Sequence, residues 1–229
     1  MFKKIISSIC IAFLLFVSTR AAYEPSMEEV SAAIYLQEQW IISNPLIDII
    51  WGMQYFKDTM RLLFSSTDSK HKWMAEKMIT SVVEHYRLWD TITRKEVAKI
   101  VVKIAGGEPA EKCEWKFKDV ETDWGCKYVE WMLEKWYIKQ AENFRPNDNI
   151  TKSEAIKLLF KARGINKIYN SDNWQKDYAM TANDLGLSAM YTDYNANALR
   201  GWIFIIASKS YDDYKTLIED TPVYSDEAM

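Results

Sequence analysis

The chain repeats itself at intervals of about 50 residues, and this repetition constrains its fold more than any other feature. Three tryptophans lie 51 and 50 residues apart, at Trp73, Trp124 and Trp174. A second motif occurs first as Ile92-Thr93-Arg94-Lys95-Glu96, then as Ile150-Thr151-Lys152-Ser153-Glu154, and in altered form as Leu199-Arg200-Gly201-Trp202. Units of this length cannot bury an apolar face alone, so three copies predict one compact body held by mutual contacts.

The Thr-x-x-Glu spacing within the second motif predicts helix starts at Thr93 and Thr151. In such a capping box the Thr oxygen accepts from a first-turn amide, and the Glu reaches back to the N–H of the cap residue. Apolar residues follow each cap at helical spacing, at Val97, Ile100, Val101 and Ile104, and at Ala155, Leu158, Leu159 and Ala162. Arg94 and Lys152 lie beside the exposed amides and the positive dipole end of each helix, which predicts a site for an anion.

The stretch from Phe117 to Gly164 carries further motifs in a fixed order. A Phe-x-Asp-Val segment at residues 117–120 precedes Trp124, and a Phe-Arg-Pro-Asn segment at residues 144–147 precedes the cap at Thr151. This order resembles one repeat of the S-layer homology family, a module of bacterial surface proteins. The resemblance implies a protein held on the cell envelope by binding wall polysaccharide, with a binding role and no catalytic one.

The repeats and the resemblance together predict an all-α fold. We expect a pseudo-threefold helical bundle of three helix-pair repeats, with the Thr-capped helices central, the Trp-led helices outside and two extra N-terminal helices. The second extra helix would follow Pro45 and carry an apolar stripe at Ile49, Met53, Phe56, Met60 and Leu63. The expected segments are a signal peptide at 1–21, an N-terminal extension at 22–66, repeats at 67–106, 107–165 and 166–210, and a C-terminal helix with an acidic tail at 211–229.

The resemblance also implies a set of ligand-binding residues. Arg94, Lys152 and Arg200 would meet carboxylate or ketal-acid groups of a wall polymer, where Arg offers two parallel hydrogen bonds and Lys a point charge. Flat faces for sugar rings would come from Trp73, Trp124 and Trp174, and Asp119 of the Phe-x-Asp-Val motif completes the set. The alternative is structural, with the tryptophans in the core and the cations solvated or paired with nearby glutamates.

The first 21 residues predict an export signal. Lys3 and Lys4 precede an uncharged apolar run from Ile5 to Val17, which suits a signal peptide and is too short for a membrane span. Removal of this segment, with Lys3, Lys4 and Arg20, would leave 26 basic against 32 acidic residues, which disfavours nucleic acid as a partner. We expect an exported protein at the cell surface, in the cell wall or S-layer, that binds an envelope polysaccharide. An uncleaved membrane anchor is the alternative.

Two of the three cysteines, Cys113 and Cys126, lie outside the predicted signal. In an exported chain an even number of cysteines suggests a disulfide, which would contribute about 3 kcal/mol. Zinc is the alternative, but His71 and His85 lack metal-binding spacing relative to the cysteines. We therefore expect a disulfide, no metal site and no cofactor.

Two other functions stay open on the sequence. In the first, the repeats are a scaffold, and residues 23–66 mediate assembly into a surface lattice or with another envelope protein. In the second, the protein is a secreted enzyme, which would need a deep pocket with convergent carboxylates. The chain contains no Gly-x-Ser-x-Gly, His-Glu-x-x-His or phosphate-binding Gly-rich motif that would support catalysis.

Ten tryptophans against seven glycines is an unusual ratio for a chain of this length. Gly186 stands twelve residues after Trp174, where a left-handed residue that ends a helix costs glycine little. Trp136 takes the same place after Trp124, where a bulky side chain at positive φ would be strained. One hypothesis is that Trp136 and Trp89 are encoded by UGA codons that the source reads as glycine. Ordinary sequence drift is the alternative.

Overall fold

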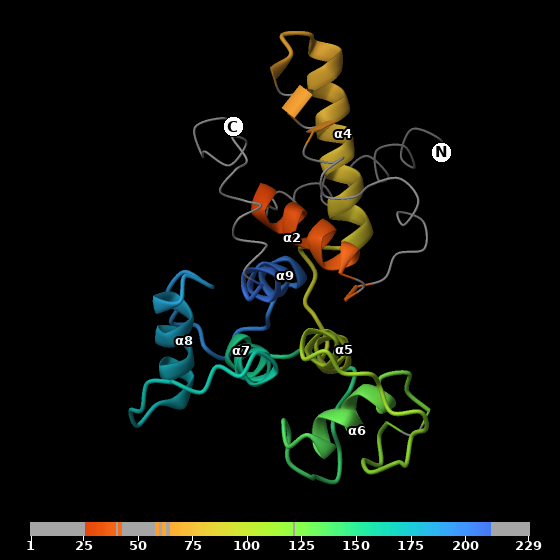
Figure 1. Ribbon diagram of the computed structural model, residues 1–229, viewed down its shortest axis with the longest axis vertical. Coiled ribbons are helices and arrows are strands. Elements are labelled where there is room, and N and C mark those ends of the chain that lie inside the picture. The colour runs from red at the N-terminus through yellow and green to blue at the C-terminus, as the bar shows by residue number, and fades with distance from the viewer. Residues whose placement is uncertain are drawn as a thin grey trace, which may run out of the picture.

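The computed structural model describes residues 26–39, 41–42, 58–59, 61–62, 65–120 and 122–211 (Figure 1). Helices with defined bounds in this part of the chain are α2 (Met27–Glu38), α4 (Ser69–Tyr86), α5 (Arg94–Ile104), α6 (Cys126–Glu134), α7 (Lys152–Ala162), α8 (Trp174–Asp184) and α9 (Arg200–Lys209). Extended segments of the described residues pair only through isolated bridges, so the predicted all-α class is confirmed. None of the described helices combines the length and the hydrophobicity that a membrane span requires.

Helices α5, α7 and α9 form the centre of the body. Figure 1 shows them end-on, with α6 and α8 outside them and α2 and α4 on the remaining side. The two predicted capping boxes form at the starts of α5 and α7. The predicted apolar positions behind these caps are buried, except for half-buried Ala162, so the sequence pattern is a correct guide to the buried faces of both helices.

Backbone hydrogen bonds join the three segments that lead into the central helices. The Ile92 amide donates to the carbonyl of Ala198 at 3.0 Å, Ala198 to Ile150 at 2.9 Å, and Ile150 to Ile92 at 3.1 Å. These three bonds close a cycle. The residue that begins each central helix adds an equivalent bond, from Arg94 to Asp148, from Lys152 to Ala196 and from Arg200 to Asp90, each at 2.9 Å. The cycle supports threefold repetition at the helix starts, while a threefold relation between the complete repeats stays a prediction.

The outer helices pack mainly on the central helix of the preceding repeat. Helix α6 packs against α5, and α8 packs against α7. The contact is close at the start of α6, where a Cβ on Gly125 would lie 2.7 Å from the Cβ of Lys95. The helix pairs that we expected within each repeat are therefore formed in space across the repeat boundaries.

Helix α2 occupies the corresponding place against α9, and α4 packs against α2 in turn. The Ser208 hydroxyl of α9 donates to the carbonyl of Ala32 at 3.2 Å, and Lys209 pairs with Glu28 at 2.7 Å. The two helices leave no room for a side chain at Gly201, because a Cβ there would lie 2.5 Å from a carboxylate oxygen of Glu29. The first N-terminal helix thus belongs to the same body as the repeats.

Several sequence predictions lie outside the described residues. These are the signal peptide at 1–21, most of the second N-terminal helix with its apolar stripe, and the final helix and acidic tail beyond residue 211. They stay predictions.

Three helix ends carry a glycine in the left-handed region, at Gly106, Gly164 and Gly186, with φ between 66° and 67°. Trp136 adopts the same conformation after α6, with φ at 62°, and its side chain is 85% exposed. The expectation of positive φ at this position is therefore confirmed. Trp89 differs, because it is partly buried against the core and is not among the described residues with positive φ.

Candidate functional site

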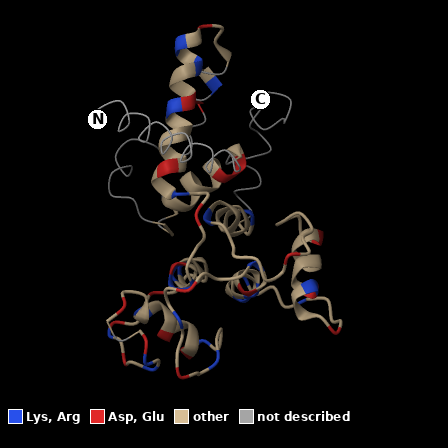
Figure 2. Ribbon diagram, turned by 180° about the vertical axis from the view of Figure 1, so that it is seen from behind, with Lys and Arg blue, Asp and Glu red and all other residues tan. Residues whose placement is uncertain are grey.

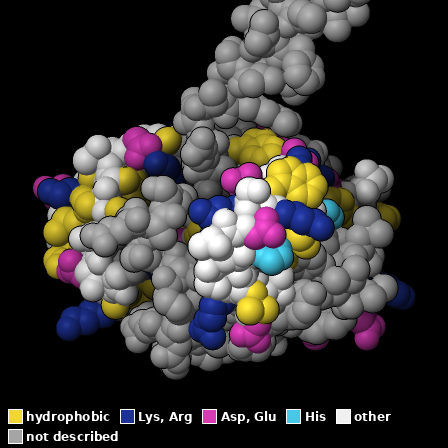
Figure 3. All heavy atoms as spheres, turned by 90° about the horizontal axis from the view of Figure 1, so that it is seen from above, with side chains coloured by type: hydrophobic (Ala, Val, Ile, Leu, Met, Phe, Trp, Pro, Cys, Tyr) yellow, Lys and Arg dark blue, Asp and Glu magenta, His cyan; other side chains and the backbone are white. Residues whose placement is uncertain are grey.

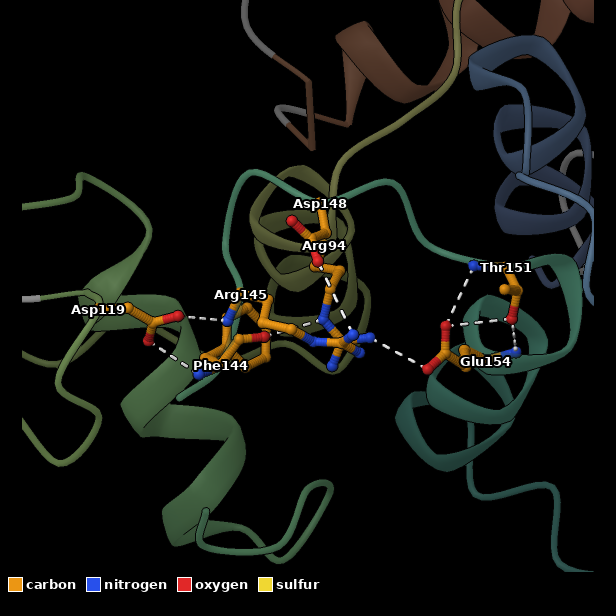
Figure 4. A network of polar contacts seen from close by, with 7 residues as sticks. All are labelled: Arg94, Asp119, Phe144, Arg145, Asp148, Thr151 and Glu154. Carbon is orange, nitrogen blue, oxygen red and sulfur yellow. Dashed lines mark hydrogen bonds and ion pairs between the residues drawn. The ribbon is translucent and has the colours of Figure 1, made fainter. Parts of the chain in front are cut away.

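The first candidate site surrounds Arg94, the first residue of α5. Its Nε donates to the carbonyl of Phe144 at 2.9 Å, and its Nη1 donates to Glu154 of α7 at 3.1 Å (Figure 4). The guanidinium carbon lies 5.0 Å from the centroid of the Phe144 ring, and the side chain is 17% exposed. Arg94 is thus held in one orientation by two elements that belong to a different repeat.

Glu154 performs two tasks at once. One carboxylate oxygen accepts from the amide and the hydroxyl of Thr151, both at 3.1 Å, while the other accepts from Arg94. Burial by itself would raise the pKa of Glu154, but the Thr151 amide and the Arg94 charge outweigh it, and the net shift is downward. The same carboxylate therefore caps α7 and orients the cation of α5.

Arg200, the first residue of α9, has the same kinds of partner, a backbone carbonyl and a glutamate of another central helix. Its Nε donates to the carbonyl of Tyr86 at 2.9 Å, and its Nη1 donates to Glu96 of α5 at 2.5 Å. Glu96 also accepts from the amide and the hydroxyl of Thr93, both at 2.9 Å. Burial raises the pKa of Glu96, yet the Thr93 amide and Arg200 lower it by more. We refer to Arg94 with Glu154 and Arg200 with Glu96 as the two Arg–Glu pairs.

The pairs leave hydrogen-bonding capacity free. A guanidinium carries five N–H donors, and each of these arginines uses one on a carbonyl and one on a carboxylate among the described residues. The remaining donors lie at the positive end of a helix, where the dipole favours an anion. Such a site can bind a carboxylate through two hydrogen bonds.

Lys152, the first residue of α7, has different surroundings. Its ammonium binds Asp193 at 2.7 Å and lies 5.5 Å and 5.8 Å from the ring centroids of Tyr191 and Trp202. Its acidic partner among the described residues is an aspartate, because Trp202 stands on α9 where Glu154 and Glu96 stand on the other central helices. The alternative in which glutamates pair the cations thus holds for Arg94 and Arg200, whereas the partner of Lys152 is an aspartate.

The three repeat tryptophans are exposed, so the alternative that placed them in the core is wrong. Trp73, Trp124 and Trp174 are 57%, 51% and 42% exposed. Trp124 and Trp174 each meet the edge of a tyrosine four residues later, Tyr128 and Tyr178, with centroids 6.1 Å apart. The ammonium of Lys95, the residue after Arg94, lies 5.3 Å from the centroid of the Trp124 ring.

Trp73 lies on α4, apart from the central helices that carry Arg94, Lys152 and Arg200. Helix α4 begins four residues before it, at Ser69, and packs mainly against α2, with only its last residue, Tyr86, against Phe204 of α9. The prediction of Trp-led helices holds only for α8, because α6 begins two residues after Trp124. Figure 3 looks onto the α4 side of the molecule and shows hydrophobic side chains beside Lys, Arg and His.

Asp119 holds the loop that carries Phe144 and Arg145. Its carboxylate accepts from the amides of Phe144 and Arg145, at 2.8 Å and 2.6 Å (Figure 4). It therefore fixes the loop that places Phe144 under Arg94, and its two oxygens point at the protein backbone. Asp119 thus positions this loop, and its role as a ligand contact stays a prediction.

Sequence reasoning missed Arg145. Its backbone has a positive φ of 61°, and its side chain, 61% exposed, lies 3.8 Å from Asp148. Figure 4 shows this side chain extending from the loop towards Arg94. Its position directly after Phe144 in the Phe-Arg-Pro-Asn motif is the signal that could have identified it.

Cys113 and Cys126 form the predicted disulfide, with Cα atoms 5.8 Å apart. Buried Glu130 lies beside it and accepts from the amides of Glu114 and Lys116, at 2.7 Å and 2.9 Å. Ligand atoms of the two cysteines and Glu130 lie within 4.8 Å of one another. Because both sulfurs belong to the disulfide, they cannot serve a metal as thiolates.

A mostly apolar pocket lies between α2 and α4, and Tyr86, whose carbonyl accepts from Arg200, is part of its lining. Its lining consists of Ile34, Gln37, Lys77, Met78, Ser81, Val82 and Tyr86. Among the described residues this lining contains no carboxylate, so it is not the kind of pocket that the enzyme alternative requires. Figure 2 shows basic and acidic residues interspersed along the helices and loops, with neither sign covering a continuous face of the ribbon.

Comparison with known proteins identifies the central part of the chain. Residues 116–156 match the S-layer homology domain family. The chain is 35% identical to a cellulosome-anchoring protein of Acetivibrio thermocellus over 75 residues, which cover 30% of this chain and 17% of that protein. It is 29% identical to a middle cell wall protein of Brevibacillus brevis over 125 residues, which cover 52% of this chain and 12% of that protein. The chain thus matches less than a fifth of the length of either relative.

Proposed function

Because residues 116–156 carry an S-layer homology domain, we propose that this protein is a non-catalytic surface protein that attaches to an anionic polysaccharide of the cell wall. The observation that carries the proposal is the pair of oriented guanidinium groups at the starts of α5 and α9, each with free N–H donors. The cell-wall and anchoring relatives support the same direction.

The Arg–Glu pairs suit binding of a carboxylate on a sugar. Each arginine is oriented before the ligand arrives, so little side-chain entropy is lost on binding. The glutamate compensates the arginine charge in the free protein. The N–H groups of the guanidinium that the described residues leave unused can donate two hydrogen bonds to a planar carboxylate. An acidic chain with net charge −3 can therefore bind an acidic polymer at these two places.

The exposed aromatic rings offer the second element of polysaccharide binding. Trp124, whose ring lies beside Lys95, and Trp174 present faces and edges that can pack on the C–H groups of sugar rings. The disulfide agrees with a location outside the cytoplasm, where disulfides persist. We propose a location at the cell surface, in the cell wall or S-layer.

The test is a pulldown of the purified protein with cell-wall sacculi. We expect Arg94→Ala and Arg200→Ala each to reduce bound protein by about tenfold or more, because each removes a bidentate charged contact. Arg94→Lys should retain only part of the binding, since Lys keeps the charge and loses the planar donor pair.

Arg163→Ala is the matched control. Arg163 is an exposed arginine at the opposite end of α7, where it lies 4.6 Å from the Tyr211 ring. Thermal unfolding of every variant separates lost binding from lost structure. Binding that survives in the folded double variant Arg94→Ala/Arg200→Ala would contradict the proposal.

Assembly through residues 23–66 is the competing proposal. Residues 29–37 of α2 are all buried, so this part of the segment is already used within the domain. No sacculus binding, together with oligomers that grow with concentration in analytical ultracentrifugation, would favour assembly over attachment.

A further inference from the structure

The two sulfurs of the Cys113–Cys126 disulfide differ in how far they can be reached from solvent. Cys126 is the first residue of α6 and is only 1% exposed. Cys113 is half-buried, in a loop whose residues 111, 112 and 114–116 are exposed. Exchange of a disulfide begins when a thiolate attacks one of its sulfurs, and access helps to decide which sulfur is attacked. A small thiol from solvent therefore meets this bond at Cys113.

A buried carboxylate lies against the same sulfur. Glu130, one turn after Cys126 on α6, is 3% exposed, and its Oε1 lies 3.7 Å from the Sγ of Cys113. Its hydrogen-bond donors among the described residues are two backbone amides, those of Glu114 at 2.7 Å and Lys116 at 2.9 Å. The Glu130 charge thus faces N–H dipoles and acts at short range on any charge that develops at the sulfur.

The surroundings of the Glu130 carboxylate are acidic. The Lys116 ammonium pairs with Glu114 at 2.9 Å. The pKa of Lys116 is raised, first by the hydrogen bond to Glu114 and further by the charges of Glu130 and Glu134. One exposed ammonium is therefore shared among three carboxylates, and the charge of Glu130 is not fully compensated.

The same glutamate holds the loop independently of the disulfide. Its bonds to the amides of Glu114 and Lys116 keep Cys113 beside α6 when the bond between the sulfurs is open. The Lys116 carbonyl accepts from the Gln140 side chain, which gives the loop a second attachment. Two sulfur atoms that stay close together react with each other far faster than with a reagent in solution. Opening of this disulfide should therefore be reversible.

We propose that Cys113 is a reversible modification site for small thiols that carry a positive charge, and that Glu130 selects such thiols by its own charge. The thiolate of the small thiol attacks the Cys113 Sγ, and a new disulfide forms between them. The bond from Cys113 to Cys126 breaks, and its electron pair leaves on Cys126 as a thiolate. No oxidant and no reductant other than the thiol takes part.

The reverse step restores the starting disulfide. The Cys126 thiolate is buried, with its sulfur within 4.8 Å of a Glu130 carboxylate oxygen, so its charge is unfavourable there. It attacks the Cys113 sulfur and expels the small thiol as a thiolate. This inference does not depend on polysaccharide binding, because it concerns α6 and the loop before it.

The charge of the reagent separates an electrostatic role of Glu130 from a structural one. Glu130 repels every approaching thiolate, more so when the reagent carries a second negative charge, and an ammonium on the reagent offsets the repulsion. A glutamate that only held the loop would change the rates of all reagents by one common factor. The ratio of the rates of two reagents is therefore the informative quantity.

The test measures the rate at which three small thiols open the disulfide of the native full chain. The reagents are cysteamine with an ammonium, mercaptoethanol without charge and mercaptoethanesulfonate with a sulfonate, at one pH and one ionic strength. Acid quenching followed by peptide mapping identifies the cysteine that carries the adduct. Exposed Lys112 and Lys127, beside the cysteines, are common to all variants, so their effect cancels when ratios are compared.

Glu130→Gln removes the charge under test. Glu134→Gln is the matched control, because Glu134 is an exposed glutamate one turn further along α6 that pairs with Lys135 at 3.2 Å. The mercaptoethanol rate reports any loosening of the loop in either variant. Comparison of the wild type with a small uncharged disulfide under the same conditions needs no variant at all.

We expect the ratio of the cysteamine rate to the sulfonate rate to fall about threefold or more in Glu130→Gln, and by less in Glu134→Gln. In the wild type this ratio should exceed that of the uncharged disulfide, and the adduct should lie on Cys113. An unchanged ratio in folded Glu130→Gln would overturn the inference. So would a wild-type ratio equal to that of the uncharged disulfide, an adduct on Cys126, or opening no faster than global unfolding.

Discussion

Two glutamates connect helix capping to cation placement at the scale of single residues. Glu96 and Glu154 each use one oxygen for the cap residue and the other for an arginine of a different central helix. The capping boxes were predictable from the Thr-x-x-Glu spacing, because a cap involves only residues within one turn. The arginine partners were not, because Arg94 and Glu154 are 60 residues apart and Arg200 and Glu96 are 104 apart.

The pKa values of both glutamates are lowered from 4.5 in the folded state, which predicts a dependence of stability on pH. A depressed carboxylate pKa contributes stability that is present above the unfolded pKa and is lost as the pH falls through the folded pKa. We expect the free energy of unfolding to decline below about pH 4.5.

Urea unfolding at pH 7 and at pH 3.5 measures this effect. The double variant Glu96→Gln/Glu154→Gln should lose part of the acid-induced decline, because glutamine has no proton to gain. A double variant with the full wild-type decline would show that other carboxylates cause it. Glu142→Gln, at an exposed ion pair with Lys118, is the control.

Trp136 places a bulky residue where other helix ends carry glycine. A left-handed conformation costs a non-glycine residue about 1–2 kcal/mol, and glycine in turn loses about 0.4–1 kcal/mol of chain entropy on folding. Because the Trp136 side chain is 85% exposed, little packing is lost on its removal. We expect Trp136→Gly to raise the free energy of unfolding by about 0.5–1 kcal/mol, measured by urea denaturation.

Gly186→Ala is the reciprocal control, since its φ of 67° should make alanine destabilising. A destabilised Trp136→Gly variant would contradict the strain argument. The codon for residue 136 tests the recoding hypothesis separately, and the geometry supports that hypothesis at Trp136 and not at Trp89. If codons 89 and 136 both read UGG, recoding is refuted.

At the scale of elements, the pairing of helices is the feature that the sequence did not reveal. Periodicity identifies the buried face of a helix, but it does not say which helix covers that face. Helix α2 has no counterpart in the repeat pattern, yet it covers α9 as α6 covers α5 and α8 covers α7. The helix pairs are therefore completed by a segment from the other end of the described chain.

The contact between α2 and α9 is closest to its steric limit at Gly201. A methyl group at this position would come within 2.5 Å of the Glu29 carboxylate, so the buried Glu29 side chain would have to leave its capping box with Ser26, or the two helices would have to move apart. We expect Gly201→Ala to lower the free energy of unfolding by about 1–3 kcal/mol, the usual cost of overpacking.

Glu29→Ala in the same background provides the internal control. It removes the atoms that the new methyl group meets, so the two changes should be less costly together than the sum of their separate costs. Strict additivity in urea unfolding would contradict direct contact between these residues.

On the scale of the whole molecule, the defining feature is the meeting of three helix starts. The cycle of bonds among Ile92, Ile150 and Ala198 fixes the spacing of these starts, so the first residue of each central helix faces an element of another repeat. Two of the three positions keep an Arg–Glu pair and the third carries aromatic side chains.

Local sequence determined the features that depend on neighbouring residues. The helix starts at Thr93 and Thr151, the buried faces of α5 and α7 and the left-handed turn at Trp136 follow from capping, periodicity and sterics within a few residues. The pairing of Cys113 with Cys126 could be expected because they are the two cysteines outside the predicted signal peptide of an exported chain.

Tertiary structure decided the contacts between residues far apart in the chain. It brought Glu154 within hydrogen-bonding distance of Arg94 and directed the Asp119 carboxylate to the Phe144 amide. It also left the repeat tryptophans exposed and packed α2 against α9. These outcomes depend on which apolar faces cover one another once the helices pack, and that choice is made by the whole chain at once.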